Sequence, residues 1–193
     1  MSAREKILNA IATNKPSLVD LPVMNLEEVI QYNDLVSQFK LVLQSIGGQV
    51  KELDDFKTLQ DEITTLRNTG IFIINTIPEI GAIDSNLSSL SADQLAALEK
   101  AYIMGTLAVA ENGAIWLYEQ QMINRLIPFI CQHLVMLVKK ENIVATMHQA
   151  YERIDISKEG FGAFIAGPSK TADIEQSLVI GAHGARSLVV YLF

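Results

Sequence analysis

Short runs of apolar residues alternate along the chain with longer segments in which apolar residues recur at helical spacing. The short runs predict buried strands, and the periodic segments predict helices with one apolar face. This alternation is typical of an α/β domain with a mostly parallel sheet and helices on both faces. The expected strands lie at about 49–53, 71–75, 101–104, 114–118, 134–138, 161–166 and 187–193, and the expected helices at about 2–12, 26–46, 56–66, 91–100, 121–130, 143–154 and 171–179.

The N-terminal part of the chain differs from the rest. Residues 2–12 predict a helix with its apolar side chains on one face, and the following stretch carries Pro16 and Pro22 and is expected to be extended. We therefore expect an N-terminal helix and extended segment over residues 1–25, followed by one domain over residues 26–193.

The composition restricts the classes of function. Hydrophobic residues make up 49% of the 193 residues, and 22 acidic against 15 basic side chains give a net charge of −7. An acidic chain without a basic cluster is not typical of a protein that binds nucleic acid or anionic membranes. No apolar stretch reaches the roughly 20 residues of a membrane span. Charged residues also occupy the N-terminus where an export signal needs an apolar core, so we expect a cytoplasmic protein.

Cysteine usage bears on cofactors. The chain contains one cysteine, Cys131, so neither an internal disulfide nor a cysteine cluster for an iron–sulfur centre can form within it. His133 and His148 have no cysteine or carboxylate neighbours at metal-ligand spacing, and we expect no metal site.

The stretch GPSKTADI follows the apolar run at 161–166. A glycine–proline turn leads into hydroxyl groups, one cation and the expected start of a helix, whose free N–H groups attract phosphate or carboxylate. In a parallel sheet, such a loop lies at the carboxyl ends of the strands, where ligands bind. The alternative is an ordinary capped helix start. The candidate ligand-binding residues here are Gly167, Ser169, Lys170, Thr171 and Asp173.

A second glycine-containing stretch, GAHGAR, precedes the last expected strand and adds His183 and Arg186 to the candidate ligand-binding residues. A histidine can donate a proton or hold an anion, and an arginine can bind a carboxylate through two hydrogen bonds. The stretch is equally consistent with a glycine-rich helix end in which His183 caps carbonyl groups.

Glu111 is the candidate catalytic residue, in the stretch AENGA between two expected strands. A carboxylate in an otherwise apolar setting can act as a base or as a nucleophile. The alternative is a plain turn, which Asn112 and Gly113 also favour.

The three stretches occur in the order AENGA, GPSKTADIE and GAHGARSLVVYL, and together they resemble the LUD domain, the lactate-utilisation protein family. The match is longest from Gly167 to Glu175. Arg125 and Pro128 also resemble the R-x-x-P stretch of that family, and His133 follows them. The resemblance covers about residues 30–193 and is closest to the short, stand-alone subunit of the lactate-utilisation operon.

Two departures from the family pattern affect candidate positions. The family's A-E-T-G-[ST] is AENGA in this chain, so hydroxyl groups are missing at Asn112 and Ala114. The family's H-G-P is HGA, with Ala185 in place of proline.

The resemblance implies a fold like ribose-5-phosphate isomerase and the CoA transferases, a three-layer α/β/α sandwich with a mostly parallel sheet. It also implies a role in oxidising L-lactate to pyruvate beside an iron–sulfur subunit, which holds the clusters, and a second redox subunit. The first hypothesis is thus an accessory subunit that holds a small anionic ligand at a helix N-terminus. The alternatives are a stand-alone isomerase or acyl/CoA-transfer enzyme that uses Glu111, and a non-catalytic interaction module.

Overall fold

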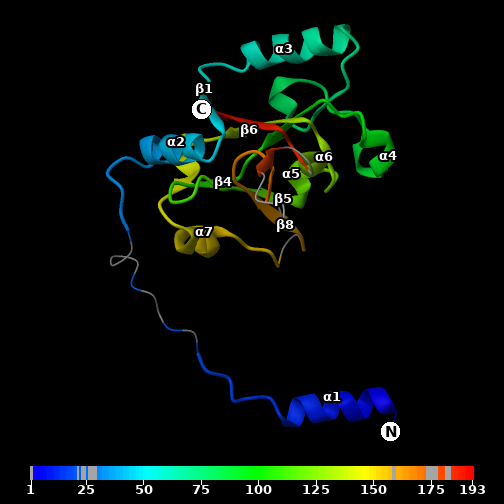
Figure 1. Ribbon diagram of the computed structural model, residues 1–193, viewed down its shortest axis with the longest axis vertical. Helices are drawn as coiled ribbons and strands as arrows, with labels where there is room; N and C mark the ends of the chain where they lie inside the picture. The colour runs from blue at the N-terminus through cyan, green and yellow to red at the C-terminus, as the bar shows by residue number, and fades with distance from the viewer. Residues whose placement is uncertain are drawn as a thin grey trace.

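A computed structural model of the protein describes residues 2–20, 22, 25, 30–157, 160–172, 178–180 and 184–193, with the backbone alone at residues 171–172 and 178–180. Two stacked sheets lie between helix α3 (Lys57–Asn68) and helix α7 (Met147–Arg153) (Figure 1). The N-terminal helix α1 (Ala3–Thr13) buries none of its residues.

The central sheet contains five strands, and every neighbouring pair in it is parallel. This confirms the expected mixed α/β fold with a mostly parallel sheet. Parallel strands are covered on both faces, which is why they appear in the sequence as continuous apolar runs. Across the sheet, the order is β1 (Gln49–Glu52), β11 (Ser187–Leu192), β6 (His133–Val138), β3 (Lys100–Met104) and β2 (Ile73–Asn75).

A second, four-stranded sheet is a feature that the sequence analysis did not predict. The chain passes into it directly after β3, at Gly105, where an added Cβ would lie 2.5 Å from Cγ2 of Ile115 and 2.9 Å from Cγ2 of Val138. Only glycine fits between the two sheets at this crossing. The order is β7 (Ile143–Val144), β4 (Leu107–Val109), β5 (Ile115–Tyr118) and β8 (Gly162–Ile165), with only β7 and β4 parallel.

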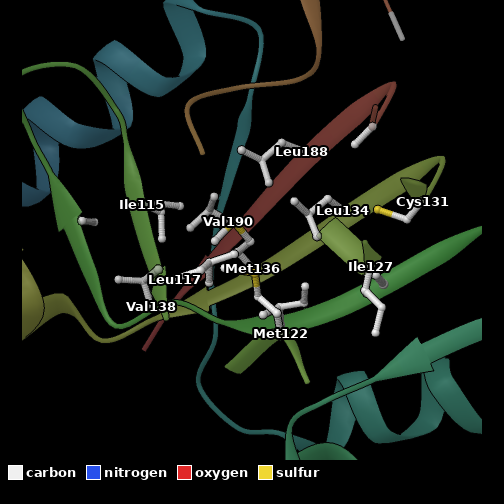
Figure 2. Packing of buried hydrophobic residues seen from close by; sticks show 14 of the residues in the cluster. Ile115, Leu117, Met122, Ile127, Cys131, Leu134, Met136, Val138, Leu188 and Val190 are labelled. Carbon is white, nitrogen blue, oxygen red and sulfur yellow. The ribbon is translucent and has the colours of Figure 1, made fainter. Parts of the chain in front are cut away.

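The core divides into three layers because side chains alternate along each strand. In β6, Leu134, Met136 and Val138 face the second sheet, as Figure 2 shows for the main core between the sheets. Val135 and Leu137 face the opposite way, into the cluster under α3. The outer face of the second sheet carries a third cluster, which includes Trp116, Val144 and Ala150 under α7.

Several helix boundaries differ from the sequence-based expectation. The expected helix at 143–154 starts later, because Ile143 and Val144 form β7. The expected helix at 121–130 is two short helices, α5 (Glu119–Met122) and α6 (Ile127–Ile130). Helix α4 (Ala92–Leu95) is short but keeps the expected capping box at Ser91. Single turns of 3-10 helix lie at Pro78–Ile80, Leu87–Ser89 and Lys140–Asn142.

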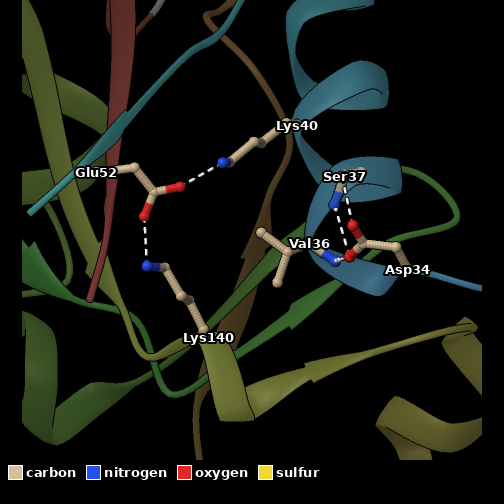
Figure 3. Close-up of polar contacts among 6 residues, drawn as sticks. All are labelled: Asp34, Val36, Ser37, Lys40, Glu52 and Lys140. Carbon is tan, nitrogen blue, oxygen red and sulfur yellow. Dashed lines mark hydrogen bonds and ion pairs between the residues drawn. The ribbon is translucent and has the colours of Figure 1, made fainter.

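Helix α2 (Leu35–Ser45) starts nine residues later than the expected 26, and polar contacts determine where it starts and how it is attached. The carboxylate of Asp34 accepts hydrogen bonds from the N–H groups of Val36 at 3.0 Å and Ser37 at 3.1 Å (Figure 3). Glu52, which ends β1, accepts hydrogen bonds from Lys140 and Lys40, and these hold its pKa below the usual carboxyl range. Glu52 therefore connects α2 to the end of the central sheet.

Glu62 connects α3 to the opposite face of the central sheet. Its Oε1 accepts hydrogen bonds from Nζ of Lys100 at 2.8 Å and from the hydroxyl of the fully buried Tyr102 at 2.7 Å. Partial burial acts to raise the pKa of Glu62, but the hydrogen bonds from Lys100 and Tyr102 outweigh it and hold the pKa below the usual carboxyl range.

We expect the Glu62→Gln variant to lose about 1 kcal/mol of unfolding free energy at pH 7. A carboxyl whose pKa is lower in the folded state stabilises the fold fully above its unfolded pKa, close to 4.5. That contribution disappears as the pH falls through the lower folded-state pKa. Urea unfolding should therefore show the full difference from wild type at pH 7 and a smaller difference as the pH is lowered to about 3. Tyr102→Phe, which removes only the donating hydroxyl, should reduce the wild-type pH dependence; an equal loss at both pH values would contradict this account.

Candidate functional site

The loop after β8 rests on the end of α2. Gly167 has φ +74°, and an added Cβ there would lie 2.9 Å from the carbonyl oxygen of Ile46. The ring of Pro168 lies over Gly47, whose added Cβ would be 3.4 Å from Cγ of that proline. The glycine is therefore needed for its left-handed backbone and for the close approach to α2.

The same loop joins the segment before β11. The N–H of Ser169 donates a hydrogen bond of 2.8 Å to the carbonyl of Ala185. Gly184 has φ +128°, and an added Cβ there would lie 3.2 Å from Cβ of Ser169. The structure thus brings the GPSK stretch and the glycine–alanine part of the GAHGAR stretch into direct contact.

A cavity of about 340 Å³ opens where these two segments meet. Its apolar wall includes Phe129 of α6, Leu134 of β6 and Phe164 of β8, and its polar rim is made by Ser169 and Lys170. Among the lining residues that the structure describes, Lys170 is the charged one, and it is exposed to solvent. A small ligand with an apolar part and an anionic group matches such a wall and rim.

The sequence predicted a site at the carboxyl ends of the parallel strands, but the cavity lies elsewhere. Leu134 belongs to the first residues of β6, and Ala185 precedes β11, so the cavity lies beside the amino ends of these two strands. The reason is that β8, which leads into the GPSK loop, pairs with β5 in the second sheet.

The expected helix after this loop is also wrong. Residues 170–172 form strand β9 (Lys170–Ala172), which pairs antiparallel with β10 (Leu178–Ile180), with Thr171 opposite Val179. No helix N-terminus is therefore available at Ser169 to Thr171. Asp173 and His183 lie outside the described residues, and for Thr171 the structure describes the backbone alone.

Arg186 does not line this cavity. Its N–H donates a hydrogen bond of 2.8 Å to the carbonyl of Gln132, and its side chain is exposed. Beside it, Nδ1 of His133 lies 2.7 Å from Oγ of Ser187, and Nε2 of His133 lies 3.5 Å from a carboxylate oxygen of Glu99. These groups form a small polar cluster at the amino ends of the central strands.

Glu111 is exposed and occupies the turn between β4 and β5. Its carboxylate accepts a hydrogen bond of 2.9 Å from the N–H of Met147, the first residue of α7. Gly113 in the same turn has φ +71°, and its added Cβ would lie 3.3 Å from Cδ1 of Ile46. The AENGA and GPSK stretches thus both meet the end of α2 at Ile46, while the Glu111 carboxylate bonds to α7 instead.

Arg125 and Pro128, the pair from the R-x-x-P stretch, have different surroundings. Arg125 binds the carboxylate of Glu119 through two hydrogen bonds of 2.8 and 2.9 Å and lies 4.7 Å from the ring centre of Phe161. Pro128 lines the cavity beside Phe129. Phe129 was not among the residues predicted from the sequence, and its only local signal is its position after that proline.

Further findings concern metal ions, membranes and the single cysteine. Within the described ranges, no group of three or more His, Cys, Asp or Glu side chains is placed to hold a metal ion. Likewise, none of the helices in those ranges combines the length and apolarity needed to cross a bilayer. Cys131 is buried, which raises the pKa of its thiol to about 12.

Comparison with known proteins identifies relatives. The family model of the LUD domain matches residues 3–193. The chain is 31% identical over 114 residues to lactate utilization protein C of Shouchella clausii, covering 56% of this chain and 50% of that protein. It is 34% identical over 106 residues to lactate utilization protein C of Geobacillus thermodenitrificans, covering 50% and 44%. The matched region therefore spans half or less of each of these two relatives.

The fold also matches a solved structure. The crystal structure of a DUF162 family protein from Deinococcus radiodurans aligns with a TM-score of 0.59 at 17% identity, covering 82% of this chain and 95% of that one. At this identity, the likeness shows a shared fold and nothing further about function.

Proposed function

The chain belongs to the LUD domain family, and we propose that it acts in lactate utilisation as an accessory subunit of a cytoplasmic complex that oxidises L-lactate to pyruvate. The observation that carries this proposal is its similarity to two proteins named lactate utilization protein C, together with a family match along residues 3–193. The long GPSKTADIE stretch resembles the family pattern, and its first four residues, 167–170, line the cavity described above.

We propose further that the cavity between the GPSK loop and the segment before β11 holds the small anionic ligand. Lys170 supplies the positive charge at the rim and Ser169 supplies polar atoms beside it. Phe129 and Leu134 provide apolar contact for a short carbon chain. This replaces the helix N-terminus of the original hypothesis with a lysine at the mouth of a partly apolar cavity.

The proposed reaction needs an electron acceptor. Conversion of L-lactate to pyruvate releases two electrons and two protons. This chain has a single cysteine, and that thiol is buried, so its residues do not form the four-cysteine set that usually holds an iron–sulfur cluster. We therefore assign the electron acceptor to an iron–sulfur partner subunit, which passes the electrons to a second redox subunit.

Lys170→Ala tests the cavity directly. We expect the variant to fold normally and to lower L-lactate-dependent dye reduction at least about tenfold at limiting lactate when it replaces the wild-type chain in the native host. The reason is that the anionic ligand loses its only cationic partner among the described lining residues.

Lys57→Ala is the matched control, because Lys57 is an exposed lysine at the start of α3, on the far side of the central sheet. It should leave the dye reduction unchanged. Full activity of Lys170→Ala would remove the cavity from the proposal, and an equal loss in both variants would show that the effect is not local.

A further inference from the structure

A second cavity, of about 210 Å³, lies on the outer face of the second sheet, beside the end of α7. Its polar lining residues include Thr106, Trp116, Tyr118 and Arg153, and its apolar wall includes Leu107 and Ile154. None of its lining residues is shared with the cavity at the GPSK loop, so the two are separate places on the molecule.

Two buried polar atoms in the lining have no hydrogen-bond partner within the described part of the chain. They are Nε1 of Trp116 and Oγ1 of Thr106. Trp116 is 6% exposed, and its ring is held by Phe164 and Tyr118 at centroid distances of 4.7 and 5.5 Å. Buried polar groups are almost always paired in folded proteins. An unpaired indole N–H, which can only donate, and an unpaired hydroxyl beside the same cavity therefore indicate a ligand with acceptor atoms.

The remaining polar lining residues favour an acceptor that is negatively charged. Arg153, in the last turn of α7, has no ion pair to any residue that the structure describes. The hydroxyl of Tyr118 already accepts a hydrogen bond of 3.0 Å from the N–H of Asp155. The cavity thus offers donors and a positive charge beside the apolar surface of Leu107 and Ile154.

We propose that this cavity is a second binding site, for a small organic monocarboxylate. The carboxylate accepts hydrogen bonds from Nε1 of Trp116, the hydroxyl of Thr106 and the guanidinium of Arg153, and the short carbon chain packs on Leu107 and Ile154. The apolar wall favours an organic acid over an inorganic anion. The inference does not rest on the proposed function, because it uses neither the family nor the GPSK loop.

The chain itself supplies the probe, since Trp116 is its single tryptophan and gives a single indole N–H signal. We would titrate the ¹⁵N-labelled full chain with propionate up to about 10 mM, tenfold above a Kd of about 1 mM. The indole N–H signal should move saturably. Arg153→Gln should weaken the fitted affinity about tenfold, and Thr106→Val should weaken it severalfold.

Controls separate specific carboxylate binding from a loss of folding and from general anion effects. Thr106→Val should keep or raise the unfolding free energy, because it replaces an unpaired hydroxyl with a methyl group of nearly the same shape. Chloride and Lys57→Ala are the negative controls for anion and variant. The proposal is overturned if the signal does not move with propionate, if chloride moves it equally, or if Arg153→Gln and Thr106→Val titrate like wild type. An absent lactate phenotype in cells would leave this titration unaffected, so the two proposals fail separately.

Discussion

The Gly162→Ala variant is expected to lose about 3 kcal/mol of unfolding free energy, a large loss for one added methyl group. An added Cβ would lie 2.1 Å from Cζ2 and 2.5 Å from Cη2 of Trp116, well inside van der Waals contact. The indole cannot move aside, because it packs in the cluster under α7 between Phe164 and Tyr118. For a chain of this size, the melting temperature should fall by about 6 to 12 °C.

Gly70→Ala is the matched control, because an added Cβ at Gly70 meets nothing within 4 Å although its φ is +78°. Its cost is only the backbone preference, about 1 kcal/mol. Thermal unfolding of both variants separates crowding from backbone strain. If Gly162→Ala melts no lower than Gly70→Ala, the close packing of β8 on Trp116 is wrong.

The Gly167→Ala variant is expected to lose about 3 kcal/mol of unfolding free energy and most of the lactate-dependent activity. The residue combines φ +74° with an added Cβ only 2.9 Å from the carbonyl oxygen of Ile46. Backbone strain and a contact that no side-chain rotation can relieve therefore act together. Relief requires the loop to move away from α2, which displaces Ser169 and Lys170 at the cavity rim.

Gly167→Asn distinguishes the two causes. Asparagine tolerates positive φ better than alanine does, but it carries the same Cβ. We expect the asparagine variant to be nearly as unstable as the alanine variant in urea unfolding, because the contact with Ile46 remains. Near-wild-type stability of Gly167→Asn would contradict the contact and leave the backbone preference as the only reason for glycine.

The parallel strands of the central sheet could be predicted because burial on both faces produces apolar runs without interruption. LVMLV at 134–138 is the clearest case, and it lies within β6. The second sheet could not be predicted in the same way. Its strand β7 has only two residues, and Ile143 and Val144 also fit the helical spacing that continues into α7. A local pattern does not specify which sheet a short strand joins.

The candidate site was predicted in part, for a similar reason. The GPSK stretch stands out locally, and the structure places Gly167, Ser169 and Lys170 at a cavity. Residues 171–179 fit a helical pattern, yet β9 and β10 pair as strands through contacts between segments that the pattern does not contain. Phe129 comes from a distant part of the chain, so its place in the cavity wall becomes apparent only in the fold. The unpaired groups of Thr106 and Trp116 likewise become visible only in the fold.

Glu111, the candidate catalytic residue, contacts the start of a helix in the fold. Its carboxylate bonds to the first N–H of α7 and lines neither of the two cavities discussed above. Such a contact stabilises the helix start, as carboxylates at helix N-termini generally do. The geometry therefore favours the binding cavity over a Glu111-based isomerase or acyl transfer as the starting point for experiments.

The most direct test of the central claim is L-lactate-dependent dye reduction in lysates of the native host with and without this gene. The account predicts that the activity is lost on deletion and restored by the wild-type chain, while Lys170→Ala restores little of it. Undiminished L-lactate-dependent reduction in the deletion strain would contradict a role in lactate oxidation, whatever the cavity binds.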